Sequence, residues 1–278
     1  MQETDKGLKA ILDYLLEKRG FDFSGYYPAM LERRISQRLA ATTCKDFHAY
    51  LSCLQRDAAE LDSLIDVITI NVSRFFRDTL TFELIADRIL PAIVREKTKV
   101  RDLSLRVWSA GCARGEEPYS LAILIHELLR KEGVAMNLHL FATDIDGKTL
   151  KDAGKALYPI SSVENIKHRL LTKYFTAEGT SFRLMPEIKK LVTFSLYDML
   201  DKKHRVPPES VFGNFDLVLC RNLLIYFNIE YQETVFEKLY QSLTHGGYLI
   251  LGEAEAPTGT WRHRFSRVFD VAAIYRKI

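Results

Sequence analysis

The chain has 278 residues, of which 47% are hydrophobic and 27% are charged, so it can form two modest domains with ordinary globular cores. Basic and acidic residues nearly balance, with a net charge of +3, which does not predict a nucleic-acid-binding protein, because such proteins usually carry a concentrated basic face. No apolar run approaches the ~18 residues of a membrane-spanning helix, and the first residues lack the pattern of a signal peptide, so we expect a cytoplasmic protein without membrane insertion.

Residues 4–97 have the hydrophobic periodicity of helices. Leucine and isoleucine recur at helical spacing from Leu8 to Leu16, and Gly20 ends that segment. Similar spacing continues through residues 31–39, 61–68 and 82–90, and Pro91 follows. The pattern predicts an all-helical N-terminal domain over residues 1–77 and a linker helix over residues 78–103.

From residue 104 the pattern changes to alternating strands and helices. Buried strands are predicted at 105–109, 138–143, 215–220 and 248–252, with a last, antiparallel strand at 268–275 and a helix at 118–129. This order predicts an α/β domain over 104–278 with a Rossmann-like, doubly wound sheet. Short strand-like runs at 182–185 and 191–194 predict a small β insertion over 155–197. A ligand is expected beyond the carboxyl ends of the parallel strands.

A glycine-bearing turn joins the first strand to its helix and predicts a nucleotide-type cofactor site. Gly111 and Gly115 bracket the turn, and Glu116 and Glu117 begin the helix. The simpler alternative is a tight turn followed by acidic residues that complement the helix dipole. These carboxylates would, however, repel the pyrophosphate of a dinucleotide, whereas the ammonium and sulfonium of S-adenosylmethionine would be attracted to them.

An acidic residue ends the second predicted strand and is a candidate for binding a ribose. Asp144 stands 33 positions after Gly111, whereas the ribose-binding acid of a dinucleotide fold follows the glycines by about 20. This spacing disfavours a nicotinamide cofactor. A helix N-cap is the alternative role for Asp144, although Asp146 is better placed for capping.

Four segments, in order and covering nearly the whole chain, resemble CheR-type methyltransferases. They are INVSRFFRD at 70–78, WSAGCARGEEPYSLAI at 108–123, FATDID at 141–146 and LCRNLLIYF at 219–227. The resemblance implies methylation of glutamate side chains on chemoreceptors, forming a glutamate methyl ester and S-adenosylhomocysteine.

The resemblance also implies roles for individual residues. Arg77 and Tyr226 are the expected catalytic pair, near the transferred methyl group. The residues expected to bind the cofactor are Asn71, Ser73, Arg77, Gly111, Glu117, Asp144, Asp198, Met199, Arg221 and Asn222. Two of them depart from the family pattern, since Ser73 replaces a usual threonine and Asp198 a common asparagine.

The expected chemistry requires no general base. A glutamate side chain has a reference pKa of about 4.3 and is already an anion at neutral pH. The enzyme must therefore align the carboxylate, the methyl group and the sulfur and exclude water. Arg77 is suited to hold a carboxylate through two hydrogen bonds, and the Tyr226 hydroxyl is suited to orient the incoming oxygen.

A basic, amphipathic stretch at 32–39 is the expected receptor-docking surface. In the family such a helix contacts the acidic helical bundle of the receptor, and Arg33, Arg34 and Arg38 are the candidates here. The loop at 177–181 is shorter than in relatives that bind a C-terminal receptor tether, so we expect recognition without a tether. A monomer is the simplest expectation.

Three alternatives remain open at this point: a noncatalytic S-adenosylmethionine-binding scaffold, a methyltransferase for RNA or a small molecule, and a nicotinamide-dependent oxidoreductase. The glycine spacing disfavours the last, and no basic channel or aromatic platform indicates RNA. Neither the seven histidines nor Cys44, Cys53, Cys112 and Cys220 have metal-site spacing, so the cysteines are expected to be reduced thiols and no metal is expected.

Overall fold

The computed structural model describes residues 2–69, 72–201 and 203–278. The chain divides into two compact units. The first unit comprises Met1–Asn71 together with Tyr226–Tyr231, and the second comprises Val72–Ile225 and Gln232–Ile278. This boundary precedes the predicted one at residue 77, so Arg77 belongs to the second unit.

The first unit is a helical domain. Its helices are α1 (Gln2–Arg19), α2 (Pro28–Ala41), α3 (Phe47–Arg56) and α4 (Ala58–Thr69). Asp46 caps α3, since its side chain accepts a hydrogen bond from the Ala49 N–H at 2.8 Å. Residues at helical spacing, including Ile11, Ile35 and Leu64, are buried and form the core.

The predicted linker helix is part of the second unit and is interrupted. It consists of α5 (Thr79–Leu84), the π-helical turn η1 (Ile85–Ile89) and α6 (Leu90–Lys99). Pro91 lies at the second position of α6 and has no N–H to donate, and a widened turn accommodates that loss. Leu90 and Ile93 pack in the same core as the sheet.

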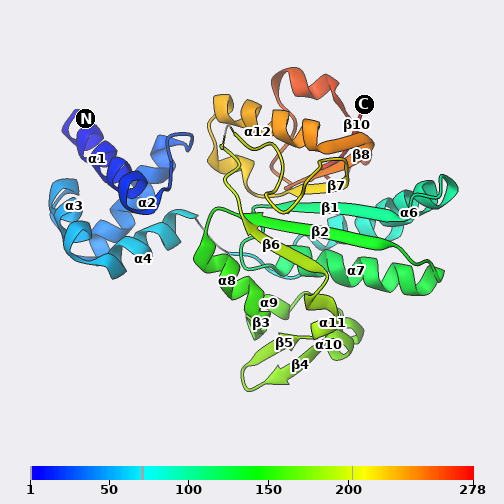
Figure 1. The fold of residues 1–278 in the computed structure, drawn as a ribbon. Helices are drawn as coiled ribbons and strands as arrows, with labels where there is room; N and C mark the ends of the chain where they lie inside the picture. Colours follow the sequence, from blue (N-terminus) through cyan, green and yellow to red (C-terminus); the bar gives the residue numbers. More distant parts are fainter. Residues whose placement is uncertain (1, 70–71, 202) are drawn as a thin grey trace. The chain divides into compact units, whose positions relative to one another are not determined.

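A seven-stranded sheet forms the centre of the second unit (Figure 1). Its strand order is β6-β2-β1-β7-β8-β10-β9. The strands are β1 (Ser104–Ala110), β2 (Asn137–Asp144), β6 (Val192–Leu196), β7 (Phe215–Cys220), β8 (Leu243–Leu251), β9 (Phe265–Arg267) and β10 (Ile274–Lys277). The strands from β6 to β8 pair in parallel, whereas β10 pairs antiparallel with both β8 and β9. The last strand predicted at 268–275 is wrong in its bounds: only its end falls in β10, and β9 precedes it.

Helices cover both faces of the sheet, as the prediction of a doubly wound fold requires. Helix α7 (Glu116–Glu132) connects β1 to β2, and α12 (Ile229–Ser242) precedes β8 on the opposite face (Figure 1). The 3-10 turns η2 (Leu224–Tyr226) and η3 (Gly259–His263) lie in the loops that follow β7 and β8. Strand order reverses between β1 and β7, so their carboxyl ends mark the ligand-binding crevice of such folds.

The β insertion between β2 and β6 is shorter than predicted. Its sheet has the order β3-β5-β4, with β3 (Leu157–Pro159), β4 (Phe175–Glu178) and β5 (Ser181–Leu184). The accompanying helices are α8 (Gly147–Lys155), α9 (Ile160–Val163), α10 (His168–Tyr174) and α11 (Pro186–Lys189). Residues 192–194 of the run at 191–194, assigned from sequence to the insertion, instead lie in β6 and pair with β2.

Within the described parts of the chain, no helix is long and apolar enough to cross a membrane.

Candidate cofactor and active site

The turn after β1 requires glycine at both ends. Gly111 and Gly115 have φ angles of +71° and +89°, which side-chain-bearing residues rarely adopt. A Cβ at Gly111 would lie 3.0 Å from Leu223 Cδ2, and one at Gly115 would lie 3.1 Å from Ala153 Cβ. The Gly111 N–H donates to the Thr143 carbonyl at 2.8 Å, which holds this turn against the end of β2.

A buried carboxylate, that of Glu117, lies at the start of α7 directly after this turn. Ser109 Oγ donates to Glu117 Oε1 at 2.8 Å, and Arg221 Nη1 donates to Glu117 Oε2 at 3.1 Å. Burial raises the pKa of Glu117, while the charge of Arg221 opposes that shift. Each carboxylate oxygen can accept more than one hydrogen bond. Glu117 is therefore suited to bind a further cation.

Arg221 joins three parts of the second unit. Besides Glu117, its guanidinium contacts Asp78 Oδ2 at 2.6 Å and the Arg77 carbonyl at 3.0 Å. It also lies 5.3 Å from the centre of the Phe82 ring, as in a cation–π contact. The Arg221 side chain is only 2% exposed. Arg221 was predicted to bind the cofactor, but its contacts in the structure chiefly support Glu117 and the backbone of residues 77–78.

Asp144 ends β2 beside the glycine turn, as predicted. Its Oδ2 accepts from the Ala113 N–H at 2.9 Å, and its Oδ1 accepts from the Asp146 N–H at 3.0 Å. Burial raises its pKa, although these backbone hydrogen bonds favour the charged form. Asp146, not Asp144, caps the following helix through the N–H groups of Lys148 and Thr149, so the capping role expected for Asp146 is confirmed. The Asp144 carboxylate is left to act as an acceptor in the crevice.

The segment after β6 lies beside Asp144, because the Tyr197 N–H donates to the Asp144 carbonyl at 3.0 Å. Met199 is buried there, and Asp198 Oδ1 accepts from the Leu200 N–H at 2.8 Å. The sheet thus brings Asp198 and Met199, both predicted to bind the cofactor, next to the predicted ribose-binding residue.

Residues 72–78, which precede α5, are held within the second unit by backbone hydrogen bonds. The Phe75 N–H donates to the Ser162 carbonyl, and the Phe76 N–H donates to Ser120 Oγ, both at 3.0 Å. Phe75 and Phe76 are core residues, as expected from their types. Ser73 and Arg77 are half-buried. Asn71, which precedes this segment and was also predicted to bind the cofactor, lies outside the described residues.

A buried glutamate missed from the sequence organises the loop after β7. Glu255 Oε2 accepts from the N–H groups of Asn222 at 2.8 Å and Gly252 at 2.7 Å, and its Oε1 accepts from Ile225 at 3.2 Å. Asn222 has a positive φ of 57°. Its predicted cofactor role depends on a loop shape that Glu255 maintains. The only sequence signal was an acidic residue shortly after a strand.

Tyr226, the second expected catalytic residue, belongs to the first unit. Its carbonyl accepts from the Tyr27 N–H at 3.0 Å, and the next residue, Phe227, packs edge-to-face on Tyr26. Arg77 belongs to the second unit. Their pairing in catalysis stays a prediction.

The three arginines predicted to dock a receptor differ in their surroundings. Arg33 is exposed and Arg34 is half-buried. Arg38 is engaged inside the helical unit, where its Nε lies 3.0 Å from Glu60 Oε1 and its Nη2 pairs with Glu60 Oε2. The Tyr50 hydroxyl donates to the same carboxylate at 2.6 Å. Arg33 is therefore the freest of the three for a partner, while Arg38 has a structural role.

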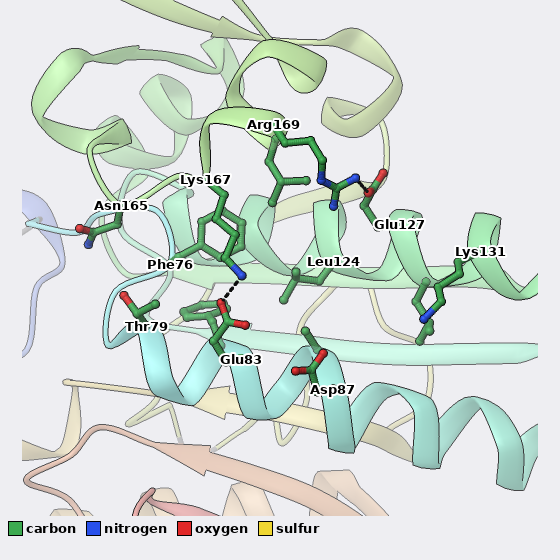
Figure 2. Close-up of a pocket in the computed structure, with 14 residues that line it drawn as sticks. Phe76, Thr79, Glu83, Asp87, Leu124, Glu127, Lys131, Asn165, Lys167 and Arg169 are labelled. Carbon is green, nitrogen blue, oxygen red and sulfur yellow. Dashed lines mark hydrogen bonds and ion pairs between the residues drawn. The ribbon is translucent and has the colours of Figure 1, made fainter.

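A groove of about 430 Å³ lies elsewhere on the second unit, between α5–η1, α7 and the α9–α10 segment. Figure 2 shows Phe76 and Leu124 in this groove, with Lys167 reaching Glu83 across it at 2.7 Å. Among the described residues, none predicted to bind the cofactor lines it. Its wall includes Phe82, which also contacts Arg221.

The residues at the strand ends fit S-adenosylmethionine. Glu117 offers a buried carboxylate to an ammonium, Asp144 offers an acceptor to ribose hydroxyls, and Gly111 permits close approach to the backbone. Two adjacent carboxylates at the start of α7 are the wrong charge for a pyrophosphate. All four cysteines are free, and the described residues contain no cluster of three or more metal-ligating side chains.

Two family models match the two parts of the chain. The model of the CheR methyltransferase SAM-binding domain matches residues 71–271, and that of the CheR methyltransferase all-alpha domain matches residues 6–69. A chemotaxis protein methyltransferase 2 of Vibrio cholerae is 31% identical over 96% of this chain and 90% of its own length. A chemotaxis protein methyltransferase of Borreliella burgdorferi is 29% identical over 92% of this chain and 90% of its own length.

A third relative is much longer. An uncharacterized 104.1 kDa protein of Rhodobacter capsulatus is 33% identical over 91% of this chain, which spans 26% of that protein.

Three findings lead to one assignment. Models of two family domains match the chain in order, its parallel sheet has acidic residues at its carboxyl ends, and the Vibrio and Borreliella relatives match over 90% of their own length. The chain belongs to the CheR methyltransferase family and is an S-adenosylmethionine-dependent methyltransferase.

Proposed function

We propose that this methyltransferase converts glutamate side chains on the cytoplasmic helical bundle of chemoreceptors to 5-O-methyl esters, and so serves adaptation in chemosensory signalling. The observation that carries the methyl-donor part of the proposal is the Glu117 carboxylate, held by Ser109 and Arg221 at the carboxyl end of the sheet. The names of the Vibrio and Borreliella relatives support the link to chemotaxis.

Bound S-adenosylmethionine supplies a methyl group on a positively charged sulfur. The substrate carboxylate oxygen forms a bond to the methyl carbon as the carbon–sulfur bond breaks, which yields the ester and S-adenosylhomocysteine without a proton transfer. The protein has to hold the carboxylate in line and exclude water. Glu117 would hold the ammonium of the cofactor and Asp144 its ribose.

Arg77 is the proposed substrate-orienting residue. Its backbone is fixed by the hydrogen bond that its carbonyl accepts from Arg221 at 3.0 Å, while its side chain is half-buried. A guanidinium held in this way presents two parallel N–H groups to a carboxylate. Tyr226 is proposed to orient the same carboxylate through its hydroxyl.

Receptor docking is proposed to use Arg33 on the exposed face of α2, with Arg34 beside it. An exposed cationic face increases the rate of encounter with an acidic bundle. The turn between β4 and β5 is short, and recognition is proposed to need no receptor tether. The enzyme is proposed to act as a monomer in the cytoplasm.

The test is methyl transfer from radiolabelled S-adenosylmethionine to purified cytoplasmic fragments of chemoreceptors. We expect base-labile label, as for a carboxyl methyl ester, and a loss of at least ~100-fold in kcat for Arg77→Ala. Arg74→Ala is the matched control, because Arg74 is exposed in the same segment.

Tight binding of S-adenosylhomocysteine without label on any receptor fragment would contradict the proposed substrate. It would favour a binding scaffold or another methyl acceptor instead. Base-stable label would point to transfer to nitrogen or sulfur.

A further inference from the structure

The carboxylate of Asp78 is placed in an unusual way at the start of α5. Asp78 is the N-cap residue of that helix, and aspartate at this position normally accepts a hydrogen bond from the first helical turn. Here its side chain makes no capping bond, and its backbone has a φ of 58° in the left-handed region. The residue forgoes a local stabilisation and adopts a conformation uncommon for a residue other than glycine.

The Asp78 carboxylate forms an ion pair with Arg221 instead. Asp78 Oδ2 lies 2.6 Å from Arg221 Nη2, and the Asp78 side chain is 21% exposed. The same Nη2 donates to the Arg77 carbonyl at 3.0 Å, and Nη1 of the same guanidinium donates to Glu117 Oε2 at 3.1 Å. One planar group therefore connects the segment that carries Arg77 to the carboxylate at the start of α7.

The direction of the guanidinium depends on its neighbours. Phe82 lies under it at 5.3 Å, which restricts its tilt, and Asp78 and Glu117 fix its rotation from two sides. A guanidinium has a rigid fork of donors, so loss of one carboxylate partner allows the plane to turn toward the other. Glu117 would then lose the geometry in which Ser109 and Arg221 each occupy one of its oxygens.

We propose that Asp78 is a positioning residue for cofactor binding, which holds Arg221 so that Arg221 orients Glu117 and the Arg77 backbone together. Asp78 acts through Arg221 and does not contact the reacting atoms. The inference rests on the cofactor of the family and not on the receptor substrate. It can therefore be tested without any methyl acceptor.

The experiment compares three single variants of the full chain. Asp78→Asn removes the charge at constant shape, Asp78→Glu keeps the charge, and Glu83→Gln removes a carboxylate from the same helix. Glu83 pairs with Lys167 in the groove of Figure 2 rather than with Arg221, so it is a matched control for the loss of one ion pair on α5. The Kd for S-adenosylhomocysteine is measured by calorimetry, well below the Tm of each variant.

Asp78→Asn is expected to raise the Kd about tenfold, since a charge-assisted contact that orients Glu117 is lost. Asp78→Glu is expected to recover most of the affinity, and Glu83→Gln to bind like the parent protein. A Kd for Asp78→Asn within about twofold of the parent value would overturn the proposal, whatever its Tm. Equal weakening by Glu83→Gln would also overturn it, because the effect would then be general to α5.

Discussion

Arg38 and Glu60 form an ion pair inside the helical unit, with Arg38 Nε 3.0 Å from Glu60 Oε1. Burial raises the pKa of Glu60, but the bonds from Arg38 and Tyr50 outweigh that effect and lower it overall. Removal of Arg38 leaves a largely buried carboxylate without its cation. We expect Arg38→Ala to lower the free energy of unfolding by about 2 kcal/mol, measured by urea denaturation.

Arg33→Ala is the comparison on the same helix. Arg33 is exposed, so its replacement is expected to change stability by no more than about 0.5 kcal/mol. If α2 docks the receptor, this variant should nevertheless slow association with an acidic receptor fragment, and added salt should reduce the difference. Equal association rates for Arg33→Ala and the parent protein would remove Arg33 from the proposed docking surface.

Gly252 permits the packing of the loop after β7. A Cβ at this position would lie 2.7 Å from both Asn222 Nδ2 and Glu255 Oε2, closer than real contacts allow. We expect Gly252→Ala to destabilise the protein by about 1–3 kcal/mol and to weaken binding of S-adenosylhomocysteine, as measured by thermal unfolding with and without the ligand. Gly154→Ala provides the control, because its Cβ would meet nothing within 4 Å in α8. That substitution should stabilise the helix by up to ~1 kcal/mol.

Glu255 should be sensitive even to an isosteric change. Its carboxylate accepts three backbone hydrogen bonds, from Asn222, Gly252 and Ile225. Glu255→Gln puts a donor where one of these N–H groups needs an acceptor, and we expect a loss of about 1–3 kcal/mol in the free energy of unfolding. Chemical denaturation measures this loss. Glu253→Gln, an exposed neighbour, should have almost no effect, and similar losses for both variants would contradict the assigned role.

Lys238 should make the free energy of unfolding depend on pH in the alkaline range. Burial lowers the pKa of this lysine to about 8, although Asp201 and Asp198 oppose the shift. Its Nζ lies 4.9 Å from the Tyr197 ring centre and 3.4 Å from the Asp198 carbonyl. Between the folded pKa of about 8 and the ordinary lysine pKa of 10.5, the unfolded chain binds more protons than the folded one. The free energy of unfolding therefore rises with pH across that window.

The measurement is the Tm of the parent protein and of Lys238→Met from pH 7 to pH 10. The parent Tm should rise relative to that of the variant above pH 8, and the two should run parallel below it. Parallel curves over the whole range would mean that Lys238 keeps an ordinary pKa.

Four of the parallel strands, β1, β2, β7 and β8, were predictable because they are largely buried and rich in apolar residues such as Val107 and Leu219. Strand β6 was assigned to the insertion because it is short and mixed in polarity, and its partner β2 lies far away in sequence. Only the fold identifies that pairing.

Distance along the chain also separates the site residues that were predicted from those that were missed. Glu117 and Asp144 follow strands directly, so their place at the crevice follows from the order of elements. The supporting roles of Asp78 and Glu255 depend on partners at distant positions: Asp78 is 143 residues from Arg221, and Glu255 is 33 residues from Asn222. A local pattern contains no sign of such a pair.

The chain forms the β insertion after α8 and returns to the main sheet at β6, which pairs with β2. Its contact with the rest of the unit includes two aromatic side chains, Tyr158 and Phe175, which meet the Phe75 ring at 4.8 and 5.2 Å. The outer part of this small sheet is therefore open to replacement while those two rings are kept. The Tyr158 hydroxyl also donates to the Arg114 carbonyl of the glycine turn at 2.8 Å, so a change to the insertion that removes this ring would reach the cofactor site.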